Sequence, residues 1–367
     1  MKTGYTLLFI LMIIGSSFAQ RTDKKEAPMS GTNGIVYSLP RTGLRIYVKT
    51  TQEKFFHGPY YQYAEALLGI KNAPSSDREN WSIDDIRIET FSEPDPAQIH
   101  TANGTAAVLV SLTPAGVLAG INAPVVVQDE EANSVSTFLA NTNIPEIPFP
   151  DLSLNSFFEK RDSTRKGTLM IKPVEEKAME AASTVTKLRK RRFKSLANGY
   201  EEQLPDGRAY EVMTEELGKL EEAYVGLFTG KSFRQTLEYS FDYIPGNNSV
   251  SGEVIFRFSE GKGVMPASDL SAKPIVIDIK KLENMAEAQA KQASEPPSVA
   301  GVLYRIPGKA EIRILNGINT MASTRLGIAQ FGTTAFVPDV LLDGSYSLTF
   351  HTGTGSIKSI QKTNQGK

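Results

Sequence analysis

Apolar and polar residues alternate along much of this chain, which predicts a β-rich protein. The alternation runs over residues 34–39 and again over 44–48, and Pro40 and Gly43 lie between the two runs. This pattern predicts a β-hairpin with its turn at residues 40–43. Further strands are predicted at 83–91, 106–112, 117–121, 233–243, 254–258, 274–279 and within 299–361.

Apolar residues at helical spacing predict three helices. A short one begins at Pro59 and ends at Gly69, and longer ones cover the segment 169–198 after Pro173 and residues 210–229. Glu175 and Glu176 lie in the first turn of the longer helix at 169–198, where a helix dipole favours acidic side chains. A short polar loop joins the two long helices, so we expect them to form an antiparallel helical hairpin.

These elements predict an α+β fold in which two β-rich lobes carry an inserted helical hairpin. The sequence divides into a flexible lead-in at 20–33, a β-rich lobe with one short helix at 34–122, an extended connector at 123–168, the helical hairpin at 169–231, a central β segment at 232–282, a linker at 283–298 and a C-terminal β-rich lobe at 299–362.

One phrase occurs twice. Gly34-Ile35-Val36-Tyr37-Ser38-Leu39-Pro40 returns as Gly301-Val302-Leu303-Tyr304-Arg305-Ile306-Pro307, and each copy is followed by an apolar-Arg-apolar triplet. Each copy also ends in two apolar strands around a Gly-containing turn. The two lobes are therefore predicted to be related by duplication, and the alternative is a pair of ordinary hairpins with the same turn chemistry.

The first nineteen residues have the pattern of an export signal. Lys2 precedes an apolar run from Tyr5 to Ile14, and small residues lead to a cleavage position before Gln20. The run is shorter than the roughly 20 residues that span a bilayer. The chain has no cysteine, so it has neither disulfides nor the lipid-bearing cysteine of a bacterial lipoprotein. We expect an exported protein that is periplasmic, peripherally associated with the outer membrane, or secreted.

Charge and motifs exclude several functions. With 40 basic and 41 acidic side chains, the chain has no overall charge for steering nucleic acid. His57, His100 and His351 have no metal-ligand spacing, and no nucleophile elbow, phosphate loop or dinucleotide fingerprint is present. No catalytic residue, metal or cofactor is predicted.

Residues 55–63 form the densest aromatic run of the chain. Helical spacing places Tyr60 in the core, and core packing is the simpler interpretation of the whole run. The alternative is a partner surface, because aromatic side chains are frequent energetic anchors of interfaces. Its candidate residues are Phe55, Phe56, Tyr61 and Tyr63.

An acidic cluster near the one tryptophan is the candidate carbohydrate site. Trp81 could stack on a sugar while nearby carboxylates contact its hydroxyls, or two carboxylates could hydrolyse a glycosidic bond. The candidate residues are Trp81, Asp84, Asp85 and Glu89. The simpler interpretation is the solvent-exposed face of a strand, followed by a loop at residues 93–96.

Two further patterns concern modification and charge. Asp162-Ser163-Thr164 resembles a three-residue O-glycosylation acceptor, with Ser163 as the modified residue, although it also fits a charged linker. Residues 187–194 hold six basic side chains. They could contact lipid phosphates, but in an antiparallel hairpin the acidic start of the second helix is expected to neutralise them.

Several phrases resemble a family of exported Bacteroidota proteins known as a domain of unknown function, type 4831. They are the two repeated phrases, Ile255-Phe256-Arg257-Phe258-Ser259 with Gly261-Lys262-Gly263-Val264, and Ile328-Ala329-Gln330-Phe331-Gly332. The resemblance implies a Gram-negative envelope setting and transfers no catalytic residue.

The sequence thus favours a non-catalytic binding, scaffolding or assembly factor of the cell envelope. Its expected partner is another envelope or outer-membrane protein, and no nucleic-acid partner is expected. The alternative is a carboxylate-based glycan hydrolase or a glycan-binding protein.

Overall fold

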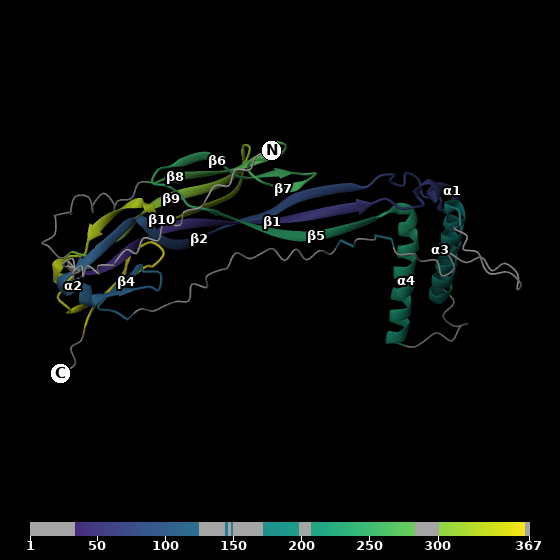
Figure 1. Cartoon of the computed structure of the whole chain (residues 1–367). Coiled ribbons are helices and arrows are strands. Elements are labelled where there is room, and N and C mark those ends of the chain that lie inside the picture. The colour runs from purple at the N-terminus through teal and green to yellow at the C-terminus, as the bar shows by residue number, and fades with distance from the viewer. Residues whose placement is uncertain are drawn as a thin grey trace, which may run out of the picture.

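One strand, β1 (Gly34–Phe56), runs through most of the length of the molecule (Figure 1). The structure is a computed structural model that describes residues 34–124, 144–145, 148–149, 172–197, 207–282 and 301–363. The predicted export signal, the lead-in, the linker, Ser163 and nearly all of the predicted connector lie outside these residues. Sheets and a few helices make up the fold, which confirms the α+β class predicted from the sequence.

The first sheet has three antiparallel strands in the order β2-β1-β5, with β2 at Arg78–Asn103 and β5 at Lys231–Tyr243. The predicted turn at residues 40–43 is wrong, because β1 continues through it. Gly43 lets the Phe91 ring pack against the backbone of β1, since a Cβ atom on Gly43 would lie 2.2 Å from that ring. The predicted loop at 93–96 is also wrong, because those residues lie inside β2.

The second sheet has five strands in the order β10-β9-β8-β6-β7 and packs against the first. Its strands are β6 (Val250–Ser259), β7 (Gly263–Met265), β8 (Lys273–Lys281), β9 (Leu303–Asn316) and β10 (Asn319–Phe336). Apolar side chains from every second position of β1, β8 and β9 meet between the sheets, as alternation requires. This main core includes Leu44, Ile46, Val48, Phe256, Ile277, Ile312 and Phe331.

The molecule is elongated, and we call its long body of sheets the rod (Figure 1). The third sheet lies at the end of the rod where the C-terminus is located. Its order is β12-β11-β4-β3, with β3 at Val110–Leu112, β4 at Leu118–Ile121, β11 at Tyr346–Phe350 and β12 at Ile357–Lys362. The short helices α2 (Gly104–Leu109) and η2 (Asp339–Leu341) precede β3 and β11. Residues 106–109 are therefore helical, and their assignment to a strand from the sequence is wrong.

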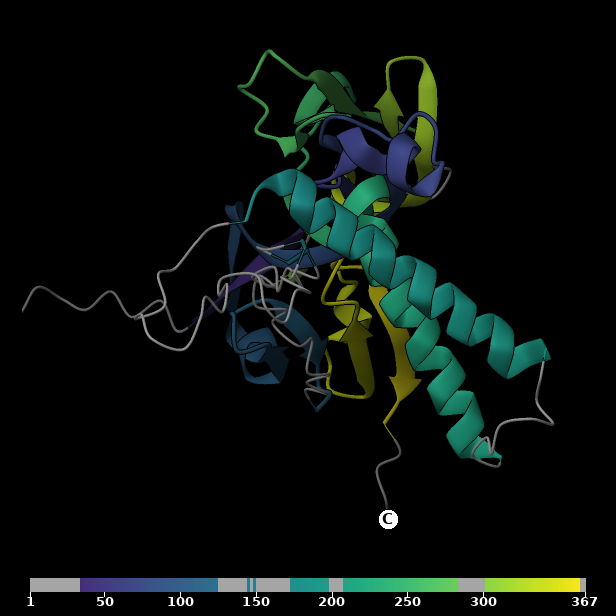
Figure 2. The same cartoon turned by 90° about the vertical axis from the view of Figure 1, so that its right-hand side faces the viewer.

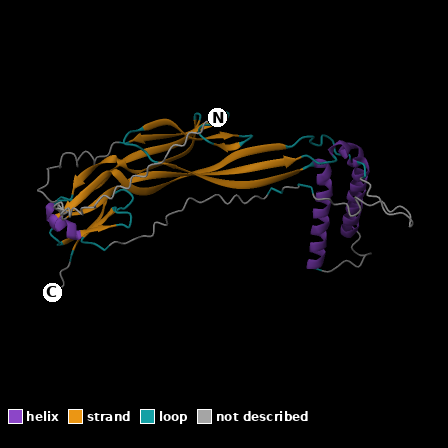
Figure 3. Cartoon of the chain, viewed as in Figure 1, coloured by secondary structure: helices purple, strands orange, loops and turns teal. Residues whose placement is uncertain are grey.

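The other end of the rod carries the long helices α3 (Val174–Ala197) and α4 (Arg208–Thr229), with η1 (Tyr61–Tyr63) and α1 (Ala64–Leu68) beside them (Figure 3). Tyr210 contacts the end of α3, and Ala178 packs near Phe228 at the end of α4, so α3 and α4 run antiparallel. They cross the long axis of the sheets and extend to one side of it (Figure 2). No helix among the described residues is long and apolar enough to cross a membrane.

Each sheet combines strands from distant parts of the sequence. β1 pairs with β5, β8 with β9, and β4 with β11. The predicted N-terminal, central and C-terminal β segments are thus joined by strand pairing.

Candidate functional site

The helical hairpin, α3 with α4, is held at the end of the first sheet by two close backbone approaches. Tyr60 N donates to Leu227 O at 2.9 Å, and a Cβ atom on Gly58 would lie 2.4 Å from that same oxygen. Gly230 links α4 to β5 with a φ of 86°, and a Cβ atom on it would lie 2.4 Å from the Phe55 ring. Glycine is required at both positions because a side chain would separate α4 from the sheet.

A small apolar core fixes the helices against this end. Its buried residues are Ala64, Ala178, Ala181, Ala182, Leu227 and Phe228. The alanines of α3 let the two helices approach closely, and the Tyr60 ring meets Phe228 edge to face, with centroids 5.6 Å apart. The helices therefore project from the sheet end as a positioned unit with their other faces in solvent.

The hairpin carries a salt bridge between its helices. Arg189 Nε and Arg192 Nη1 each lie 2.9 Å from a different carboxylate oxygen of Glu221, whose side chain is 15% exposed. The hydrogen bond from Arg189 is the main cause that holds the pKa of Glu221 below its usual range. Of the acidic residues expected to neutralise the basic residues of α3, Glu215 and Glu216 pair instead with Lys219 of their own helix at 2.8 and 3.0 Å. Glu201, Glu202 and Asp206 lie outside the described residues.

The aromatic candidates from the sequence lie at this end but do not share one surface. Phe55 and Phe56 are consecutive strand residues, so their side chains lie on opposite faces of the sheet. Phe56 meets Phe233 edge to face, and Arg78 lies over Phe55. Tyr61 packs against the His57 ring, and Tyr63 packs against the small apolar core. All four rings are partly buried.

His57 is fixed beside these rings by hydrogen bonds to Asp77. Its Nδ1 lies 2.6 Å from Asp77 Oδ1, and its backbone N donates to the same oxygen at 2.8 Å. These hydrogen bonds, that from the backbone first, lower the pKa of Asp77. The arrangement anchors the segment before β2 to the end of β1.

The carbohydrate candidates are divided between core and surface. Trp81 is 8% exposed and packs in the main core, where its ring lies against Gly263 and its Nε1 donates to Glu79 at 2.8 Å. Asp84, Asp85 and Glu89 are exposed. The tryptophan and the carboxylates thus do not form one stacking surface. Ser163, the predicted O-glycosylation residue, lies outside the described residues and stays a prediction.

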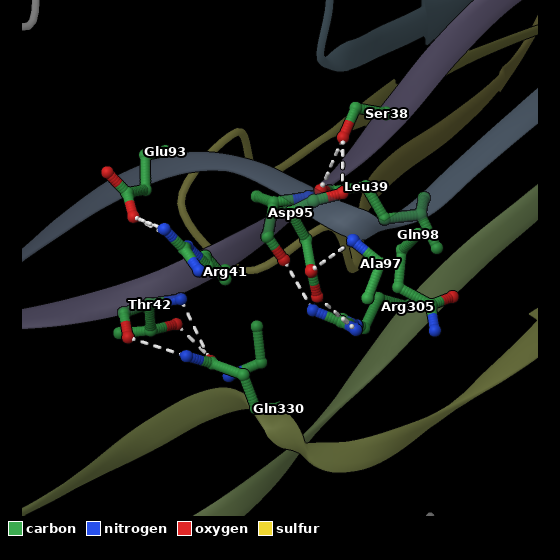
Figure 4. Close-up of polar contacts among 12 residues, drawn as sticks. Ser38, Leu39, Arg41, Thr42, Glu93, Asp95, Ala97, Gln98, Arg305 and Gln330 are labelled. Carbon is green, nitrogen blue, oxygen red and sulfur yellow. Dashed lines mark hydrogen bonds and ion pairs between the residues drawn. The ribbon is translucent and has the colours of Figure 1, made fainter. Parts of the chain in front are cut away.

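A buried polar junction lies where the two repeated phrases meet (Figure 4). Arg305 Nη2 lies 3.0 Å from Asp95 Oδ2, and Arg305 Nη1 donates to Pro40 O at 2.6 Å. The Arg305 and Asp95 side chains are only 7% and 11% exposed. Burial lowers the pKa of nearby His100, and the Arg305 charge adds to the effect.

The side-chain amide of Gln330 completes the junction by pairing with the backbone of Thr42, as a neighbouring strand would. It accepts from Thr42 N at 2.9 Å, and its Nε2 donates back to Thr42 O at 2.9 Å (Figure 4). These two bonds satisfy the edge of β1 just before β5 begins to pair at Leu44. Arg305, Asp95 and Gln330 all form hydrogen bonds with backbone atoms, so the junction joins the two halves of the molecule. Its polar groups are used in this way, and we therefore consider the helical hairpin as the candidate interaction site.

Comparison with known proteins assigns the family. The model of the family described as Domain of unknown function (DUF4831) matches residues 33–358. The chain belongs to this family. No curated protein and no solved structure matches it. The DUF4831 match includes both repeated phrases, the polar junction and the helical hairpin.

The polar junction of this DUF4831 member was missed in the sequence, although the repeat contained a signal. Where the first phrase has Ser38, the second has Arg305, a charge in an otherwise apolar stretch. A buried arginine requires a partner, and Asp95 lies between Pro94 and Pro96, a context that suggested a loop. Sequence alone does not bring the two residues together.

Proposed function

We propose that this protein is a non-catalytic binding or assembly factor that uses its helical hairpin to contact another protein. The observation that carries the proposal is the placement of α3 and α4, which extend sideways from the end of the long first sheet (Figures 1 and 2). A helix pair displayed in this way offers a surface that the core does not use.

The outward face of α4 supports a protein partner. Val212 and Leu220 lie two turns apart and are exposed, with Glu211, Glu215 and Glu216 nearby. We propose that these two apolar positions, with the charged residues around them, form the contact. The same helix buries Leu217 and Phe228 against its neighbours, so its inner face is already occupied.

Cross-linked co-purification from fractionated cells tests the proposal. The double variant V212E/L220E should lose a protein that the unchanged chain captures, because it places charge on the apolar positions. The matched control is L270E/I318E, which makes the same change at two exposed apolar positions in the turns before β8 and between β9 and β10. Recovery of the unchanged chain as a lone monomer, or equal capture by both variants, would contradict the proposal.

We also propose that the protein is exported and not lipidated, and that it is periplasmic, held at the outer membrane by protein contacts, or secreted. The leader-like pattern of residues 1–19 and the absence of cysteine support this. Cell fractionation with mass determination of the mature N-terminus tests it. A mature chain that begins near Gln20 in the periplasmic, outer-membrane or culture fraction is expected, and a full-length cytoplasmic chain would refute it.

We infer that the two halves arose by duplication. Ser38 N donates to Gly116 O at 2.9 Å, and the equivalent Arg305 N donates to Gly355 O at 3.0 Å. The pairing of β1 with β2 also breaks beside Pro40, and that of β9 with β10 breaks beside Pro307. Other family members should keep the two phrases and both breaks at matching positions, and a member that has only one of them would oppose the inference.

The alternative function, glycan hydrolysis or binding, keeps only part of its support because Trp81 is buried while the carboxylates are exposed. The triple variant D84N/D85N/E89Q separates the two functions. A glycan turnover that this variant abolishes with the fold intact would replace the assembly-factor proposal.

A further inference from the structure

The outward face of α3 carries a basic surface near the end of the helical hairpin. At about 100° per residue, four basic side chains of its second half fall within roughly one third of the helix circumference. They are Lys187, Lys190, Arg191 and Lys194, which we call the basic face. The opposite side of the same helix holds the buried residues Ala178, Ala181 and Val185.

The salt bridge to Glu221 divides the basic residues of α3 into two groups. Arg189 and Arg192 point toward α4 and are neutralised there. The four residues of the basic face are exposed and form no ion pair with any residue in the described part of the chain. Among the described residues, the antiparallel arrangement therefore neutralises two of the six basic side chains of the cluster.

Phe193 adds an apolar component beside the basic face. Its ring is 71% exposed, although it lies between Arg192 and Lys194 in a helix of 24 residues that offers an inner face for burial. An exposed aromatic ring among lysines and arginines is typical of helices that lie in a membrane interface. There the ring enters the headgroup region and the cations contact phosphates.

The described acidic residues of α3 and α4 form no ion pair with the basic face. Glu176 and Glu180 share the outward side of α3, but they lie near its first turns, and Glu180 is paired with Lys172. On α4, Glu221 is paired with Arg189 and Arg192, and Glu215 and Glu216 are paired with Lys219. The screening length in physiological salt is about 8 Å, so more distant carboxylates weaken the positive potential of the basic face little.

We propose that the basic face and Phe193 bind an anionic membrane surface through the phosphates of lipid headgroups. Helix α3 would lie flat on the headgroups with the Phe193 ring inserted among them, and the sheets would extend away from the contact. This contact uses α3 and is independent of the protein contact assigned to α4. It would hold at a membrane surface a chain in which no described helix can cross one.

Vesicle co-sedimentation tests the membrane contact. The probe is a phosphatidylcholine vesicle with or without phosphatidylglycerol, and the protein is the chain from Gln20, so that the apolar run from Tyr5 to Ile14 cannot itself bind lipid. We expect salt-sensitive binding to the anionic vesicles only. Each basic residue near such a surface contributes about 1 kcal/mol, or about fivefold in partitioning.

Matched variants assign the binding to this face. Loss of the four charges should lower partitioning at least tenfold, while removal of four exposed lysines from the sheets should change it less than twofold. The test variant is K187Q/K190Q/R191Q/K194Q, and the control is K262Q/K273Q/K309Q/K358Q. F193A should weaken binding at high salt more than at low salt, because it removes the apolar part.

Three results would overturn the proposal. They are absence of binding to anionic vesicles at low salt, equal loss in the test and control variants, and binding to neutral vesicles that the test variant retains. A salt-dependent dimer that forms without lipid and disappears in the test variant would instead assign the basic face to the acidic helix of a second copy.

Discussion

At the residue scale, the buried pair of Arg305 and Asp95 joins strands that are 210 positions apart in the chain. Such a pair contributes little net stability, because desolvation offsets the attraction, but removal of one partner leaves a buried charge without compensation. Pro40 O also depends on Arg305 for its hydrogen bond. A single substitution in the junction should therefore cost more stability than the intact pair contributes.

Arg305→Met should lower the free energy of unfolding by about 3 kcal/mol, because the Asp95 carboxylate would remain buried and unpaired. Denaturant titration measures the loss. The control is Arg325→Met, which removes a 73% exposed partner of Glu311 and should cost less than about 1 kcal/mol. Equal losses in the two variants would show that the junction charge is solvated.

Gly332 is the second sensitive residue of the junction. A Cβ atom there would lie 1.7 Å from Ile306 O, so Gly332→Ala must push two strands apart and should cost at least about 2 kcal/mol. Gly246→Ala is the matched control, because a Cβ atom at that position meets nothing within 4 Å. Thermal unfolding of both variants measures these costs. A Gly332→Ala variant as stable as the unchanged chain would contradict the close approach of Gly332 to Ile306 O.

At the element scale, the helical hairpin depends on the charge of Glu221. Its pKa is lowered in the folded protein, so its stabilising contribution is complete above the unfolded value of about 4.3 and is lost as pH falls through the folded value. Because the two arginines are half exposed, we expect only about 0.5–1 kcal/mol.

Glu221→Gln should therefore destabilise the helices at neutral pH and flatten their loss of stability as pH falls below the unfolded pKa of about 4.3. Thermal unfolding followed by helical circular dichroism measures both effects. The neighbouring Glu222→Gln has no ion-pair partner among the described residues and should behave like the unchanged chain. If Glu221→Gln leaves the pH dependence of thermal stability unaltered, the salt bridge does not stabilise the helices.

The strands and long helices could be located from the sequence because they obey periods of 2 and 3.6 residues. The wrong predictions concern residues whose type suggests one local structure while their contacts in the fold require another. Gly43 and Pro40 suggested a turn, but Gly43 makes room for the Phe91 ring and the Pro40 carbonyl accepts from Arg305. Residues 106–109 kept the apolar pattern of a strand while forming a helix. Only long-range contacts distinguish these cases.

The candidate site could be predicted less well than the fold. Sequence spacing placed the basic cluster and the second half of the aromatic run on helical segments, but it did not predict that β1 continues through Phe55 and Phe56. It also did not show which side chains face outward. The separation of Arg189 and Arg192 from the basic face depends on where α4 packs and on the position of Glu221. The burial of Trp81 depends on Gly263 of β7, which lies far away in the sequence.

At the scale of the whole molecule, the buried apolar residues of the described part of the chain form three separate clusters: one between the two large sheets, one at the third sheet and one under the helices. Local unfolding can follow such divisions. We therefore expect the helical hairpin to open without disruption of the main core.

Ala178→Asp tests this independence, because it places a carboxylate in the core under the helices. Hydrogen exchange of α3 and α4 amides should accelerate on the order of 100-fold, about 2.8 kcal/mol, while that of β8 and β9 should change little. The converse variant Ile312→Ala should lower global stability by about 2–5 kcal/mol. Parallel acceleration in all elements after Ala178→Asp would mean that the protein unfolds as one unit.

The continuity of β1 has a mechanical consequence. The strand reaches from the polar junction to the base of the helical hairpin without a break, and its 23 residues extend about 75 Å. A pull on α4 passes through Gly230 into β5, which pairs with β1 over residues 44–56. Hydrogen bonds perpendicular to the pull share the load in shear instead of opening one after another. The pairing of β5 with β1 therefore suits the molecule to transmit tension applied at the helical hairpin toward its far end.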